Sequence, residues 1–218
     1  PNKGHFDLVQ LEKTFKINII TQNIDDLHEK AGSSSIIHMH GELNKVRCIM
    51  DESHIFEWYE NLDETHKCPH CGAQMRPHVC FYGEMPYQMD EIHNLAMECS
   101  LFVSIGTSGG TYPAAGFVSL FKEMKKPTVE LNLEPSLNQS QFDFAIHKPA
   151  TIAVEEFMNL LIKNKIHYAT FLVALQIGLM LYVPVGEINS TPSSSTEIFL
   201  LLTPSNLSSI VTEDMFSY

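Results

Sequence analysis

Hydrophobic residues in the first 165 positions follow two patterns. Short β-rich runs occupy residues 17–20, 101–105 and 129–133. Such runs are typical of strands that are buried in a parallel sheet. Ile92, Leu95, Ala96 and Cys99 instead recur at the spacing of one helix face. The alternation of strand-like runs with helical stripes predicts an α/β fold.

Two further helices are predicted by the same spacing. Pro113 can open one of them because its missing N–H costs nothing in the first turn of a helix. The apolar stripe of that helix consists of Ala114, Phe117, Val118, Phe121 and Met124. The other helix runs through residues 154–161. These helices would join the strands as crossover connections.

Between residues 41 and 84 the periodicity fades, and cysteine and histidine become frequent. Cys48 lies 20 residues before Cys68, which begins a Cys-Pro-His-Cys arm that ends at Cys71. This spacing is typical of a zinc ribbon, so these three cysteines are the predicted metal ligands. The first arm has no second cysteine. Candidates for the fourth ligand are Asp51, His54, His66 and His70. The alternative is a ribbon that has lost its metal.

The pattern of apolar and polar residues changes again after Lys165. Residues 168–185 are almost wholly apolar, and residues 190–196 are rich in Ser, Thr and Pro. The tail could be a core or docking helix, a membrane anchor, or a non-native segment from an altered reading frame. We expect residues 166–218 to lie outside the folded body, because the helix and strand patterns stop before them.

The net charge and the cysteine content disfavour two classes of protein, nucleic-acid binders and disulfide-stabilised secreted proteins. The 218 residues carry a formal net charge of −12 and are 44% hydrophobic. This charge disfavours direct nucleic-acid binding, because phosphate recognition needs an excess of cations. Five cysteines with no visible secretory signal favour a reducing compartment over a disulfide scaffold. We therefore expect a cytoplasmic protein that does not bind membranes.

Polar side chains follow the first strand-like run. Gln22, Asn23 and Asp25 come directly after residues 17–20. Ligands of open α/β sheets bind at the carboxyl ends of the strands, so these amides and this carboxylate are candidate ligand contacts. The alternative interpretation is a capped turn, in which Asp25 or Asp26 begins a helix through Leu27.

Three other segments carry candidate chemistry. His40 precedes Gly41 in a predicted turn, and an imidazole is the usual proton acceptor near neutral pH. For any one of the eleven histidines, however, a structural role is the default. Small residues 106–111 follow the second run, and Asn132 to Glu134 lie at the carboxyl end of the third. Because three strand ends carry such groups, we expect a shared ligand crevice.

Taken together, these motifs resemble the sirtuin family of NAD-dependent protein-lysine deacylases. The family's Thr-Gln-Asn-Ile-Asp block matches residues 21–25, and its His-Gly matches His40-Gly41. Its acyl-peptide segment matches residues 76–86, and three nucleotide loops match residues 106–108, 132–134 and 149–150. The resemblance covers residues 1–163, and residues 112–117 look most like the short bacterial, desuccinylase-like class.

The resemblance implies a Rossmann-like parallel sheet with a zinc-ribbon insertion, and a role for each matched residue. His40 would be the general base. NAD would be bound by Gln22, Asn23, Ile24, Asp25, Gly106, Thr107, Ser108, Asn132, Leu133, Glu134 and Ala150. The acyl-lysine protein substrate would be bound by Val79, Tyr82, Gly83 and Glu84. Zinc would be bound by Cys48, Cys68 and Cys71.

The predicted domains follow from the same match. Residues 1–41 and 85–165 would form the NAD-binding domain, and residues 42–84 the zinc ribbon, in a monomer. Sirtuins open with a strand and a Gly-Ala-Gly-x-Ser loop that the sequence before Thr21 does not contain. We therefore expect little activity from the chain as given. The alternative function is an inactive fragment that serves as a weak nucleotide-binding or interaction module.

Overall fold

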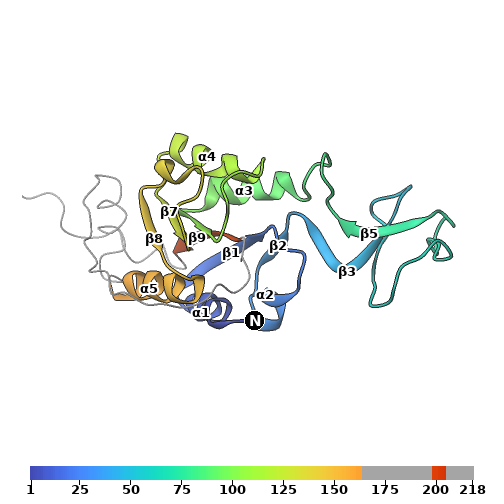
Figure 1. Cartoon of the computed structure of the whole chain (residues 1–218), viewed down its shortest axis with the longest axis horizontal. Helices are drawn as coiled ribbons and strands as arrows, with labels where there is room; N and C mark the ends of the chain where they lie inside the picture. The colour runs from blue at the N-terminus through green and yellow to red at the C-terminus, as the bar shows by residue number, and fades with distance from the viewer. Residues whose placement is uncertain (164–197, 205–218) are drawn as a thin grey trace, which may run out of the picture.

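The computed structural model describes residues 1–163 and 198–204, and it has a larger and a smaller part (Figure 1). The larger part is a six-stranded sheet with helices on both faces. The smaller part is a three-stranded sheet at the opposite end of the molecule. The predicted α/β class with a small inserted module is confirmed.

The larger sheet has the order β2-β1-β9-β6-β7-β8. Its strands are β1 (Phe15–Thr21), β2 (Ile36–His38), β6 (Leu101–Ile105), β7 (Thr128–Asn132), β8 (Phe144–His147) and β9 (Ile198–Pro204). Its helices are α1 (Lys3–Leu11), α2 (Leu27–Ala31), α3 (Met89–Glu98), α4 (Phe117–Glu123) and α5 (Ala150–Lys163). The three β-rich runs of the sequence overlap β1, β6 and β7, and those strand predictions are confirmed. All direct pairings among β1, β2, β6, β7 and β8 are parallel.

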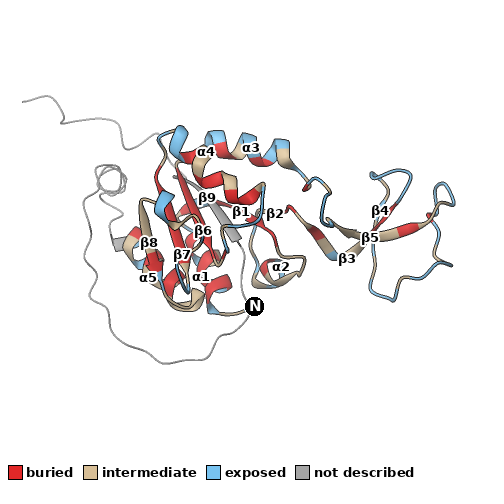
Figure 2. Ribbon diagram, turned by 45° about the horizontal axis from the view of Figure 1, so that its top comes forward, coloured by how far each residue is buried: buried red, intermediate tan, exposed pale blue. Residues whose placement is uncertain are grey.

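Helices cover both faces of this sheet, α1 and α5 on one face and α3 and α4 on the other (Figure 1). Successive side chains of a strand point to opposite faces, and the burial follows that rule. Leu101 and Val103 of β6 pack toward α1 and α5, whereas Phe102 between them packs toward α4. The ring of Phe102 stacks on Phe121 with centroids 4.6 Å apart. Figure 2 shows buried residues both in the strands of the sheet and in the helices that pack on it.

The strand β9 corrects the prediction that residues 166–218 lie outside the folded body. Ile198–Pro204 pairs antiparallel with β1 along one edge and with β6 along the other. In the common doubly wound order 3-2-1-4-5-6, a parallel strand holds this central position. Here the tail supplies an antiparallel strand instead, so the sheet is mixed. Residues 168–185 and 190–196, for which three interpretations were open, lie outside the described residues.

The smaller sheet has the order β4-β3-β5 and is antiparallel. Its strands are β3 (Gly41–Cys48), β4 (Ile55–Glu57) and β5 (Met75–Val79). Among the described residues, its core consists of four buried residues, Val46, Cys48, Cys68 and Met75, and four partly buried side chains packed against them, Phe56, Trp58, Leu62 and Ala73. So small a core stabilises little by hydrophobic burial alone, which favours a metal as the organising element. The domain boundaries at residues 41 and 84 stay a prediction.

No helix among the described residues combines the length and apolar character needed to span a bilayer.

Two buried histidines make the larger part sensitive to acid. His28 of α2 lies against His5 of α1, with ring centroids 4.7 Å apart. Within the described residues, neither ring nitrogen of His28 has a hydrogen-bond partner. Burial, followed by the charges of His5 and His38, lowers the pKa of His28 to about 3. An unfolded histidine has a pKa of about 6.5. The unfolded chain therefore binds a proton at pH values where folded His28 does not.

We expect this difference to lower the free energy of unfolding as the pH falls from 6.5 toward 3. The slope due to one such group approaches about 1.4 kcal/mol per pH unit. His28→Gln should flatten the pH dependence of stability, measured by urea denaturation between pH 7 and pH 4.5. The exposed His93 of α3 offers the matched control His93→Gln. An unchanged slope in His28→Gln would contradict this account.

Candidate active site and metal centre

His40 lies in the turn between the two sheets, and backbone hydrogen bonds hold that turn from three directions. The amide of Met39 donates to the carbonyl oxygen of Thr21 in β1 at 3.0 Å. The amide of Cys80, next to β5, donates to the carbonyl oxygen of His40 at 2.9 Å. The amide of Tyr87, just before α3, donates to the carbonyl oxygen of Met39 at 2.9 Å. The turn is thus fixed between the carboxyl end of β1 and the end of β5.

The imidazole of His40 is oriented by the chain that follows β1. Its Nδ1 lies 3.1 Å from the carbonyl oxygen of Gln22. Because a carbonyl oxygen only accepts, Nδ1 carries the proton and donates it to this bond. Nε2 is then the nitrogen with the free electron pair. The ring is half-buried, so the arrangement suits proton removal from a neighbouring group.

Gly41 is required by the same turn. Its φ angle is +84°, in the region that favours glycine. A Cβ atom at this position would lie 2.0 Å from the carbonyl oxygen of His78. Any other residue would therefore push β3 away from β5 and displace the adjacent His40.

The segment after β1 brings several predicted NAD contacts close to His40. The carbonyl oxygen of Asn23 lies 3.0 Å from Nδ1 of His38, and Nε2 of His38 lies 2.7 Å from Glu29. The carbonyl oxygen of Ile24 accepts from Leu43 at 2.7 Å. These bonds hold the backbone and leave the Asn23 side chain half-buried at the edge of the sheet.

Asp25 was predicted either to contact a ligand or to cap the helix through Leu27, and the structure shows the capping bond. Its Oδ1 accepts from the amide of Leu27 at 3.1 Å, at the start of α2. The formal N-cap residue, Asp26, makes no capping bond with its side chain. Since a carboxylate offers further lone pairs, this bond is compatible with a ligand contact as well.

The loop after β6 closes over a small pocket. Thr107 is buried, and its Oγ1 lies 2.8 Å from Oγ of Ser104. The pocket has room for about one water molecule, about 10 Å³, and is lined by Gln22, Thr107, Ser108 and Asn138 among others. The structure thus brings the strand ends of β1 and β6 together. Gly106 is held by a backbone bond to Leu131 at 2.8 Å.

The other predicted nucleotide contacts lie outside this pocket. Asn132 at the end of β7 donates from Nδ2 to the carbonyl oxygen of Thr107 at 2.8 Å and accepts from Leu133 at 2.9 Å. Its amide therefore ties two loops together. Leu133 and Glu134 are exposed, and Ala150 is the first residue of α5, close to Gly4 of α1.

Asn138 also lines this pocket and was not among the predicted site residues. Its Nδ2 donates to the carbonyl oxygen of Ala115 at 3.0 Å, and its Oδ1 accepts from Ser136 at 2.9 Å. A Cβ atom on Gly109 would lie only 2.2 Å from that Oδ1. Asn138 therefore shapes the pocket wall. No motif marks it, and only its place in a turn-rich segment after β7 could have drawn attention to it.

The predicted substrate residues form one continuous segment. Val79 ends β5, and the turn that follows contains Tyr82, Gly83 and Glu84. The Tyr82 side chain is fully exposed, and Gly83 has a φ angle of +89°. β5 is an edge strand of the smaller sheet, so its outer edge can accept another strand. This segment begins one residue before Cys80, which bonds the His40 backbone.

The three predicted metal ligands meet in the smaller part, and the structure adds His54 as the fourth. One donor atom each from Cys48, His54, Cys68 and Cys71 lies within 4.8 Å of the others. The Cys48 and Cys71 sulfurs are 3.4 Å apart, and His54 Nδ1 is 3.6 Å from the Cys68 sulfur. Three sulfurs and one imidazole at such distances fit tetrahedral zinc.

Groups next to His54 and Cys48 favour metal binding by these four residues. The carboxylate of Asp51 lies 3.5 Å from Nε2 of His54, the ring nitrogen that does not face the Cys68 sulfur. It can therefore orient the ring, as carboxylates commonly do for zinc-bound histidine. Burial opposes ionisation of the Cys48 thiol, but hydrogen bonds from the backbone amides of Met50 and Asp51 and from the side chains of Cys71 and Cys68 together lower the pKa of Cys48 to about 7. Of the four candidates for the fourth ligand, only His54 belongs to this donor group.

We expect purified protein to contain about one zinc ion per chain. Cys68→Ser should remove most of it and unfold the smaller sheet, because its core is too small to fold alone. Elemental analysis and far-UV circular dichroism measure the two effects. Cys99→Ser, which changes a cysteine in the core of the larger part, is the matched control. A metal-free protein after gentle purification would contradict the zinc prediction.

Known proteins give an independent comparison. The Sir2 family model matches residues 1–113. The NAD-dependent protein deacylase of Pasteurella multocida is 48% identical over 162 residues, covering 72% of this chain and 69% of that protein. The NAD-dependent protein deacylase of Salmonella typhimurium is 47% identical over 168 residues, covering 75% of this chain and 61% of that protein.

Solved structures show the same fold. A crystal structure described as a Sir2 homolog–NAD complex superposes with a TM-score of 0.66 at 31% identity. The match covers 75% of this chain and 65% of that one. The chain thus spans roughly two thirds of the length of the proteins it resembles.

Proposed function

The chain belongs to the Sir2 family, and we propose that it removes acyl groups from lysine side chains of proteins with NAD as co-substrate. The observation that carries this proposal is the position of His40. Its ring is oriented by the segment after β1, and its backbone is bonded to the segment after β5. A single turn therefore joins the proposed nucleotide side of the site to the proposed peptide side.

In the proposed reaction, the acyl oxygen of the modified lysine attacks C1′ of the NAD ribose, and nicotinamide leaves with the bonding electron pair. Nε2 of His40 accepts the proton of a ribose hydroxyl, and the resulting alkoxide attacks the imidate carbon. Addition of water and release of the lysine amine leave the acyl group on the ribose. The products are nicotinamide, lysine and O-acyl-ADP-ribose.

The other roles follow from placement. Asn23 and Asp25 would position the ribose and nicotinamide, and Gln22 would support the ribose. The adenosine half would lie along the ends of β6 and β7, near Ser108. Among the residues proposed for it there, Ser108, Leu133 and Glu134 are exposed, whereas Thr107 is buried. We propose that Thr107 shapes this loop from within while its exposed neighbours contact the ligand.

Substrate would pair with the free edge of β5 and the turn after it. An extended peptide can add to such an edge through its backbone, which tolerates many side-chain sequences. The proposed acyl group is acetyl, with succinyl and malonyl as the alternatives from the resemblance to the desuccinylase-like class. The zinc ion would stabilise the smaller sheet and take no part in the chemistry.

We also propose that the protein is a cytoplasmic monomer. Cys48, Cys68 and Cys71 fit a metal site only as reduced thiols, and all five cysteines lie free in the described residues. A reducing compartment preserves that state.

Release of nicotinamide from NAD tests the function. Acetyl-, succinyl- and malonyl-lysine peptides serve as substrates, and an unmodified peptide is the blank. Two forms are assayed: the 218-residue chain, and the same chain preceded by a Sir2-type strand and Gly-Ala-Gly-x-Ser loop. Peptide-dependent turnover in either form supports the proposal. Turnover in neither form, with folded and zinc-loaded protein, contradicts it.

A further inference from the structure

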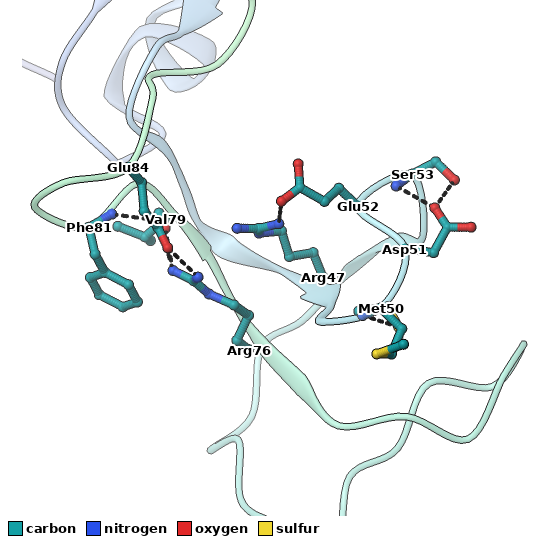
Figure 3. A network of polar contacts seen from close by, with 10 residues as sticks. Arg47, Met50, Asp51, Glu52, Ser53, Arg76, Val79, Phe81 and Glu84 are labelled. Atoms are coloured by element: carbon teal, nitrogen blue, oxygen red, sulfur yellow. Dashed lines mark hydrogen bonds and ion pairs between the residues drawn. The ribbon is translucent and has the colours of Figure 1, made fainter.

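The turn after β5 is held by an arginine that belongs to the strand itself. In Figure 3, Arg76 reaches along β5 to Glu84 at the far end of the turn. Its Nη1 lies 2.5 Å from Oε1 of Glu84, and its Nη2 lies 3.0 Å from Oε2. Nη2 also donates to the carbonyl oxygen of Val79 at 3.1 Å. A two-point bond of this kind fixes direction as well as distance.

Glu84 passes this constraint on to the backbone of the turn. Its Oε2 accepts from the amide of Phe81 at 2.9 Å, and its own amide donates to the Phe81 carbonyl oxygen at 3.0 Å. The guanidinium of Arg76 lies 4.5 Å from the centre of the Phe81 ring. Arg76 lowers the pKa of Glu84 to about 2, so the carboxylate remains charged at physiological pH. We call this closed set of contacts among Arg76, Val79, Phe81 and Glu84 the Arg76 clamp.

The Arg76 clamp determines which backbone groups a pairing peptide can reach. The carbonyl of Val79 and the amides of Phe81 and Glu84 are engaged inside it, and the amide of Cys80 is bonded to His40. Tyr82 and Gly83 take no part in these bonds. They form the tip of the turn, where Tyr82 is fully exposed. The clamp therefore presents the tip in one conformation and sets the register of a strand added beside it.

We propose that Arg76 is a positioning residue for the acyl-peptide. It acts through Glu84 and holds the Val79–Glu84 turn in the conformation that pairs with the substrate backbone. This inference rests on the proposed deacylase function and assigns Arg76 no contact with NAD or with the reacting atoms. Loss of the clamp should thus weaken peptide binding more than it slows the chemical step.

Kinetics with separate variation of the two substrates test this role. We expect Arg76→Ala to raise KM for an acetyl-lysine peptide about tenfold or more, the value of a lost charge-assisted hydrogen bond. KM for NAD and kcat at saturating peptide should change much less. Arg76→Lys keeps the charge but loses the planar fork, so its peptide KM should be intermediate. An unchanged peptide KM, or equal losses with both substrates, would overturn the proposal.

A matched pair of glutamates controls for general damage to the smaller part. Glu84→Gln removes the charge that Arg76 binds, whereas Glu52→Gln removes the charge that pairs with Arg47 on the neighbouring strand (Figure 3). Only Glu84→Gln should raise the peptide KM. Equal effects of the two variants would assign the loss to the stability of the small sheet and overturn the positioning role.

Amide hydrogen exchange separates this inference from the function on which it rests. Arg76→Ala should speed exchange at Phe81 and Glu84, while exchange in β1 and β6 stays as in the unmodified protein. Faster exchange at these amides in a protein that shows no turnover would support the clamp as a structural feature. It would refute the deacylase proposal and, with it, the role of Arg76 in substrate binding. Unchanged exchange at Phe81 would refute the clamp itself.

Discussion

His40→Ala is expected to lower the rate of NAD-dependent deacylation about 10²–10⁴-fold, the usual effect of removing a general base. The ring of His40 donates Nδ1–H to the Gln22 carbonyl and so keeps Nε2 free as a base. Alanine retains the backbone bonds of Met39, His40 and Cys80, so the turn should keep its shape. The measurement is nicotinamide release in the form of the chain that shows turnover.

His93→Ala is the matched control for this prediction, because His93 is an exposed residue of α3 outside the turn. It should leave turnover unchanged. Circular dichroism and zinc content of the His40→Ala protein should equal those of the parent. Full activity of folded His40→Ala would refute the assignment of the base.

Removal of β9 is expected to abolish cooperative unfolding of the larger part. A chain that ends after Lys163 leaves β1 and β6 without their shared neighbour, which pairs along the full length of both strands. Unpaired backbone groups inside a sheet cost about 1–3 kcal/mol each, and the freed edges favour aggregation. If residues 166–218 lay outside the folded body, as the sequence pattern predicted, the same deletion would leave the melting temperature unchanged. Thermal scanning with light scattering measures unfolding and aggregation.

A point substitution tests the same strand without deleting the tail. Leu201 pairs with Asn18 of β1 and with Phe102 of β6. Leu201→Pro removes one backbone donor from the middle of the sheet and should lower Tm by several degrees. Leu201→Ile keeps the donor and serves as the control. Equal Tm values for the two variants would show that β9 contributes nothing to the stability of the sheet.

The sequence predicted the strands that are buried on both faces. β1 and β6 present apolar side chains to helices on each side, so their runs stand out by themselves, and β7 adds Val129 and Leu131 to one of the two cores. β9 could not be placed in this way. Its pairing partners lie far away in the sequence, and an apolar run after a Ser/Thr/Pro-rich stretch does not reveal which edge it will join. The short helix α1 went unnoticed because its buried face includes the polar residues His5 and Asp7.

The same contrast holds for the candidate site. The cysteine spacing predicted three metal ligands, but four local donors competed for the last place, and only the fold of the loop before β4 selects His54. Motifs indicated His40 and the strand ends. They could not show that the side-chain amide of Asn132 would donate to the carbonyl oxygen of Thr107, or that the guanidinium of Arg76 would bond the carboxylate of Glu84. Such pairings depend on loop geometry, which local patterns do not encode.

The position of β9 has a consequence for how this protein is made. Phe15 of β1 pairs with Pro204 of β9, a residue far away in the sequence. On the ribosome, β1, β2, β6, β7 and β8 are therefore all synthesised before the strand that belongs between them. Contacts of such long sequence separation form slowly, and until they form, two hydrogen-bonding edges stay open to other nascent chains or to chaperones. Synthesis of β9, which follows that of β1 and β6, thus sets the moment at which the sheet can close.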